Sequence, residues 1–198
     1  MNSSNGPKIS QLWWDLSDLK EESYDAVLAN EEYKNLRLSL IPRNLDALPN
    51  ELWFWGSLAR VRSRELLHVD VPWFVCSKRM LAALESVGDF PHRVLPAHFR
   101  EAREGKDGTI EGEYVVLVIT EANDLLDRER SEIEYHRDGS ILLVSRWVFR
   151  DTPARIPPIF KPREQRSLWL VSEECRTVLE ENGFKGLVLK PQENIGRL

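Results

Sequence analysis

The residues best suited to chemistry lie in one acidic segment in the middle of the chain. Carboxylates beside a histidine can bind a divalent ion or transfer protons. Their spacing, however, matches neither a calcium-binding loop nor the His-Glu-x-x-His pattern of zinc enzymes. Arg128 and Arg130 are interleaved with the acids, which favours ion pairs at the surface. The acidic and imidazole side chains of this segment are Glu121, Asp124, Asp127, Glu129, Glu132, Glu134 and His136.

The same segment gives the chain its one charge asymmetry. Residues Glu101 to His136 include eleven acids and four bases, a net charge of −7. The whole chain carries −5, so the remainder carries +2. This distribution favours a basic partner and argues against non-specific binding of nucleic acid. Six side chains are therefore predicted to contact a partner: Asp124, Asp127, Glu129, Glu132, Glu134 and His136.

Other reactive side chains form no convergent set. The four histidines do not cluster with cysteine at metal-binding spacing. Cys76 and Cys175 are expected to be small buried hydrophobes rather than a disulfide. We therefore predict no catalytic residue, metal or cofactor, and a protein that is not an enzyme. A small metal-dependent hydrolase or transferase using residues 121–136 is the alternative.

A β-hairpin is predicted to display the acidic side chains. Ile133–Arg137 and Ser140–Val144 are strand-like and are joined by Asp138-Gly139, a sequence that favours a two-residue primed turn. The period of a strand places Glu132, Glu134 and His136 on one face of this hairpin. A second strand, Glu113–Thr120, is apolar on both faces and is expected at the centre of a sheet.

Two similar strand–helix–strand units lie about ninety-five residues apart and are predicted to form the scaffold. In each, a short apolar run ends at a serine, Ser77 or Ser172, placed to cap the following helix. Neither serine lies in a nucleophile-elbow sequence, so capping is favoured over catalysis. Gly88 and Gly183 fall where a left-handed residue would end each helix.

Composition predicts one folded domain. The chain has 198 residues, 42% of them hydrophobic, and no apolar stretch of membrane-spanning length. We expect a flexible tail at 1–10, an N-terminal elaboration at 11–68 with a short helix at Glu21–Asn30, and a repeat-containing domain at 69–198 in one globule with it. The fold class is α+β, with a mixed or antiparallel sheet, two pseudo-repeated units and a hairpin. The opening residues lack a secretory signal, which favours the cytoplasm.

The tryptophans of the N-terminal part allow two interpretations. They could form a stacking platform, but Trp53 and Trp55 share one strand face, and packing in the core or between subunits explains them better. The tryptophans concerned are Trp13, Trp14, Trp53 and Trp55.

The chain resembles a bacterial family of immunity proteins from polymorphic toxin systems. The resemblance rests on the two units, the central strand and the segment Asp127–Ser131 before the hairpin. The resemblance covers Val69 to Pro191. It implies an intracellular α+β protein that binds and neutralises a cognate protein toxin, and it carries over no catalytic residue. A homodimeric adaptor that associates through the tryptophan-rich region is a further alternative, and the sequence leaves the oligomeric state undetermined.

Overall fold

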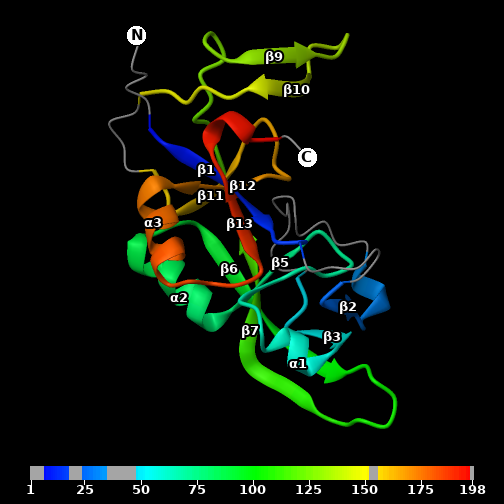
Figure 1. The fold of residues 1–198 in the computed structure, drawn as a ribbon. Coiled ribbons are helices and arrows are strands. Elements are labelled where there is room, and N and C mark those ends of the chain that lie inside the picture. Colours follow the sequence, from blue (N-terminus) through cyan, green and yellow to red (C-terminus); the bar gives the residue numbers. More distant parts are fainter. Residues whose placement is uncertain (1–6, 18–23, 35–47, 152–155, 197–198) are drawn as a thin grey trace.

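Two sheets and a separate hairpin form the structure, which is mostly β with a few helices (Figure 1). The computed structural model describes residues 7–17, 24–34, 48–151 and 156–196. The larger sheet has six strands in the order β2-β3-β6-β7-β5-β4, and β7 pairs antiparallel with both β5 and β6. The strand predicted at Glu113–Thr120 is thus central. The six strands are β2 (Ala26–Leu28), β3 (Leu52–Gly56), β4 (Leu66–Leu67), β5 (Phe74–Ser77), β6 (His92–Glu101) and β7 (Thr109–Ile119).

The second sheet has five strands in the order β13-β1-β12-β11-β8. β1 pairs antiparallel with β12 and β13, so the first strand of the chain holds the last two together. It includes buried Ile9 and Ser10, two residues that the sequence analysis assigned to a flexible tail. The strands are β1 (Ile9–Trp14), β8 (Ala122–Asn123), β11 (Ile159–Pro162), β12 (Trp169–Ser172) and β13 (Leu187–Lys190).

Strands from the predicted N-terminal elaboration pair within the larger sheet. One of them corrects the helix expected at Glu21–Asn30, because Ala26–Leu28 form β2, paired antiparallel with β3. Ala26 and Leu28 are buried and Val27 between them is exposed. This alternation of burial has the two-residue period of a strand. Pairing with a neighbouring strand therefore overrides the local helical spacing.

Two helices connect strands in equivalent ways. α2 (Lys78–Val87) follows β5, and α3 (Glu173–Glu181) follows β12. The Ser77 hydroxyl accepts a hydrogen bond from the Met80 amide at 3.1 Å, and the Ser172 hydroxyl accepts one from the Cys175 amide at 3.2 Å. Each serine thus satisfies one backbone donor that the first turn of a helix leaves free.

The two helices end differently. Gly183 has φ 61°, the left-handed conformation that glycine adopts without steric cost. Gly88 has φ 159° and ψ 174°, which is extended backbone, so the prediction of a left-handed residue is wrong there. Only three residues separate Gly88 from β6, which starts at His92.

Three apolar cores hold the elements together. The first lies under β2, β3 and α1 (Leu58–Val61), where Phe54 stacks on Phe99 at 5.3 Å between ring centroids. The second joins the two sheets through α2 and α3, with Phe74 packed against Trp169 at 4.7 Å. The third core includes Val144, Trp147 and Phe149 and lies under the hairpin predicted at residues 133–144. Short 3-10 helices occupy Glu31–Tyr33 and Gln192–Asn194.

A buried carboxylate joins β2, α1 and β4. The Asp25 side chain is fully buried and accepts hydrogen bonds from Arg60 Nε at 2.6 Å and from the His68 amide at 2.8 Å. Arg64 Nη1 lies 3.6 Å from the same carboxylate. Burial lowers the pKa of the neighbouring His68. This cluster ties the first strand of the larger sheet to the helix and loop that follow β3.

Candidate functional site

The predicted hairpin forms a two-stranded sheet of its own at one end of the molecule, seen at the top of Figure 1. It consists of β9 (Glu132–Tyr135) and β10 (Ile141–Arg146), paired antiparallel. Val144 is buried in the third core, and Trp147 and Phe149 continue that core beyond the strand. An isolated hairpin is only marginally stable in water. Its attachment to the third core is therefore what holds it in place.

The turn of this hairpin is longer than predicted. The Gly139 amide donates to the His136 carbonyl at 3.0 Å, and the His136 amide donates to the Ser140 carbonyl at 2.8 Å. Arg137, Asp138 and Gly139 thus form a three-residue loop with Gly139 left-handed at φ 81°. The prediction of a two-residue primed turn is wrong. The Asp138 carboxylate accepts from the Ser140 amide and hydroxyl at 2.9 and 2.6 Å, which favours the longer loop.

Three of the six predicted contact residues are engaged in ion pairs with arginines. Asp124 lies 2.9 Å from Arg150 Nη2, Asp127 lies 2.6 Å from Arg130 Nε, and Glu132 lies 2.8 Å from Arg146 Nε. The hydrogen bond from the Arg130 side chain lowers the pKa of Asp127. The local negative charge is consequently smaller than the count of acidic residues implies, and these exposed pairs contribute little to stability.

The other three predicted residues are Glu129, Glu134 and His136, and all are exposed. Within the described residues, neither glutamate has a basic nitrogen within ion-pair distance. Glu134 is opposite Leu143 on β10, which is also exposed. Glu134 thus lies on the hairpin beside exposed apolar side chains, and Glu129 lies in the turn that leads into it.

The exposed apolar residues of the hairpin were missed by the sequence analysis. Tyr135 is 51% exposed and Leu142 is 54% exposed. Leu142 lies at a register shift between the pairs formed by Ile141 and Leu143. A signal for this exposure is present in the sequence, since the run Ile141–Val144 is apolar on both faces, whereas a two-stranded sheet can bury only one of them.

Metal-binding groups and cysteines were the remaining side chains considered for chemistry in the sequence. They contain no group of three or more His, Cys, Asp or Glu side chains arranged to hold a metal ion. Cys76 and Cys175 are buried, and burial raises the pKa of Cys175 to about 12 and that of Cys76 further. Neither thiol therefore supplies a thiolate nucleophile near neutral pH.

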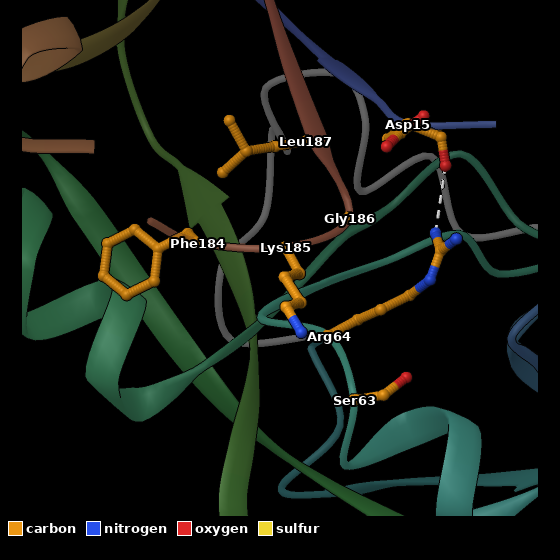
Figure 2. A pocket seen from close by; sticks show the side chains of 7 residues that line it. All are labelled: Asp15, Ser63, Arg64, Phe184, Lys185, Gly186 and Leu187. Carbon is orange, nitrogen blue, oxygen red and sulfur yellow. Dashed lines mark hydrogen bonds between the residues drawn. The ribbon is translucent and has the colours of Figure 1, made fainter. Parts of the chain in front are cut away.

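A pocket of about 370 Å³ lies where the two sheets meet (Figure 2). It was not anticipated from the sequence. Arg64 spans it and donates to the Asp15 carbonyl at 3.0 Å, and the Ser63 hydroxyl donates to the Arg60 carbonyl at 2.7 Å. The Glu65 and Leu66 amides both donate to the Lys185 carbonyl, at 2.9 and 3.2 Å. The polar groups around this pocket thus hold the junction of the two sheets together.

A family comparison agrees with the resemblance seen in the sequence. The model of the Immunity protein family (Imm11) matches residues 19–194, which is most of the chain. The chain belongs to this immunity protein family. The match also covers much of the N-terminal part, which the sequence resemblance did not reach.

No curated protein matches the chain. Membership of the Imm11 family indicates an immunity function and implies a toxin as partner. In the described part of the chain, no helix is both long enough and apolar enough to cross a membrane.

Proposed function

We propose that this Imm11 protein binds its cognate toxin tightly and neutralises it by steric occlusion, in the cytoplasm. The observation that carries the proposal is the hairpin surface, in which the unpaired Glu134 carboxylate lies beside exposed apolar side chains on an element that projects from the sheets (Figure 1). Apolar contacts supply affinity at an interface, while charges on the rim steer a basic partner and fix its orientation.

The six acidic and imidazole side chains have different roles in this proposal. Glu129, Glu134 and His136 meet the toxin directly, since they are exposed and have no ion pair among the described residues. Asp124, Asp127 and Glu132 are held by arginines in the free protein, and a basic toxin would compete with those arginines for them. The surface comprises Asp124, Asp127, Glu129, Glu132, Glu134, His136, Tyr135, Leu142 and Leu143.

We further propose that the two strand–helix–strand units are pseudo-repeats that form the scaffold behind this surface. Their topology supports this. β5 and β6 flank the antiparallel strand β7, where Leu117 is paired with both Phe74 and Val94. β12 and β13 flank β1 in the same way, where Leu12 is paired with both Trp169 and Leu189. Both helices start at a capping serine and pack against each other.

Co-expression with the toxin encoded beside this protein tests the proposed function. We expect the wild-type protein to rescue growth and to co-purify with the toxin. The double variant Glu129→Lys and Glu134→Lys should lose rescue, because it places like charges against a basic partner. Glu173→Lys with Glu174→Lys on α3 is the matched control, with the same change of charge elsewhere, and should still rescue. Failure of the wild-type protein both to rescue and to co-purify would refute the immunity function.

A further inference from the structure

Among the described residues, no helix packs on one face of the larger sheet at β2, β3 and β6. On this face Val27 is paired with Trp55, and Trp55 with Arg100, so the three side chains form a row across the strands. Val27 is 40% exposed and Trp55 is 43% exposed. α2 packs on β5 and β7 and does not extend over Val94 on β6. Val94 is therefore also exposed. The row therefore leaves two large apolar side chains exposed on a face that no described helix covers there.

The centre of this face is ordered by aromatic and cationic contacts. The Arg100 guanidinium lies 4.3 Å from the centre of the Trp53 ring and 5.7 Å from that of Trp55. The ring of Trp53 also packs on His98 at 4.8 Å. Among the described residues, no carboxylate is within ion-pair distance of Arg100. Tryptophan and arginine dominate the energetics of protein interfaces, and here the arginine is already held in place.

The outer edge of this sheet is closed, so a partner must bind the face. The Asp25 amide donates to the His68 carbonyl at 2.7 Å, and the Leu28 amide donates to the Asp70 carboxylate at 2.7 Å. Ala26 also forms a bridge with Val69. These bonds occupy the edge of β2 that an added strand would need.

The charged residues of this face, Glu51 and Arg100, are self-complementary. Glu51 directly precedes β3 and lies two residues before Trp53. Arg100 lies two residues after His98 on β6, which runs parallel to β3. Trp53 and His98 are paired with each other. Consider two copies related by a twofold axis that lies in the interface and runs across the strands at this pair. The axis places Glu51 of one copy opposite the Trp55–Arg100 row of the other. Glu51 is exposed and contacts only Trp53 Nε1 and His98 among the described residues.

From this arrangement we infer that two copies of the chain associate face to face through Val27, Trp53, Trp55, Val94 and Arg100. Each copy contributes tryptophans to the centre, and each Arg100 pairs with Glu51 of the other copy. The hairpin projects at the top of Figure 1, whereas β2 and β3 lie at the side of its lower half, so dimerisation leaves the proposed toxin-binding surface free. The tryptophans could also stack on bases of a nucleic acid, but a face with one arginine beside Glu51, on a chain of net charge −5, is poorly suited to phosphates.

Charge exchange at Glu51 and Arg100 tests this inference with the full-length protein. The measurement is the molar mass by sedimentation and light scattering over a range of concentrations. We expect the wild type to be a dimer, and Arg100→Glu and Glu51→Arg each to be monomeric alone because like charges then oppose one another. An equimolar mixture of these two variants should form a heterodimer, since opposite charges meet at both contacts.

A change at the centre of the face provides a second readout. Trp55→Ser should raise the dimer dissociation constant by at least about tenfold, as loss of an interface hot spot does. Val188→Ser on β13 is the control, because Val188 is 41% exposed but lies in the other sheet. Far-ultraviolet circular dichroism should show that all variants fold.

Several results would overturn the inference. These are a monomeric wild type at all concentrations, a dimer dissociation constant that Trp55→Ser leaves unchanged, and a mixture of the charge variants that stays monomeric. Loss of toxin binding on Trp55→Ser in a monomeric protein would assign the face to the toxin instead. Dimerisation and growth rescue are separate measurements, so failure of one leaves the other intact.

Discussion

Two groups of carboxylates in this protein have opposite surroundings. Asp25 is fully buried between two arginines and the His68 amide, and it joins α1 to two strands of the larger sheet, β2 and β4. The carboxylates on the hairpin and in the segment before it are exposed or partly exposed, and those that are paired contact exposed arginines. The first group has been removed from water and the second has not.

The comparison shows that burial, rather than the number of acidic residues, decides what a carboxylate does. A buried carboxylate that loses a partner leaves an uncompensated charge in the interior, which is costly. An exposed pair gains little because water competes for both charges. The Asp25 cluster therefore acts on stability, whereas the hairpin can exchange its partners and is suited to binding.

The largest expected effect follows from removal of the buried carboxylate. Asp25→Ala should lower the free energy of unfolding by about 3–5 kcal/mol, because it leaves Arg60 and Arg64 without their shared acceptor. Urea denaturation measures this change. Asp124→Ala on the exposed side is the control and should cost less than about 1 kcal/mol. Equal losses in the two variants would remove the distinction between the two groups.

The next effect concerns a second buried charge, Lys161 on β11. Its ammonium donates to the Arg166 carbonyl at 2.8 Å and lies 3.6 Å from the centre of the Trp169 ring. Burial lowers the pKa of Lys161 from 10.5 to about 7. Between these two values the unfolded chain binds a proton that the folded protein does not, so stability should rise with pH. Below pH 7 the lysine is charged in both states and the cost of burying it is full.

We therefore expect the free energy of unfolding to increase by about 1–2 kcal/mol between about pH 7 and pH 8.5 through this one group. Urea denaturation at several pH values measures it. Lys161→Met should keep the packing on Trp169 and remove this part of the pH dependence. An unchanged profile in that variant would show that Lys161 does not carry the effect.

The sequence predicted the secondary-structure elements better than it predicted the surroundings of individual side chains. The strand at Glu113–Thr120 and the hairpin are local signals, written in apolar runs and turn residues, and both are present in the structure. The contact of β1 with β12 and β13 joins the two ends of the chain, and no local pattern indicates it. Asp25 could not be identified as buried, because its arginine partners lie more than thirty residues away.

The candidate site was likewise predicted in part. The acidic residues of the hairpin were found from composition, but their arginine partners were not all adjacent in sequence. Arg146 reaches Glu132 because β10 folds back along β9, and Arg150 reaches Asp124 because Leu126 and Phe149 form a bridge beyond the hairpin. The open face at Trp55 also depends on where α2 ends its cover, which is a property of the packing of helices on the sheet.

The smallest effect on stability is expected at the hairpin itself. Asp127→Asn should change the free energy of unfolding by less than about 1 kcal/mol, because its pair with Arg130 is exposed. The same variant should weaken toxin binding more at low salt than at high salt, since screening reduces the contribution of exposed charges. Isothermal calorimetry at two ionic strengths measures this. Binding that is equally weakened at both would indicate a structural role for Asp127.

Hydrogen–deuterium exchange with and without the cognate toxin tests the central claim most directly. If the hairpin is the toxin-binding surface, the toxin should slow exchange across residues 129–146 and leave β2 and β3 unchanged. Protection of β2 and β3 with no change at 129–146 would contradict the account.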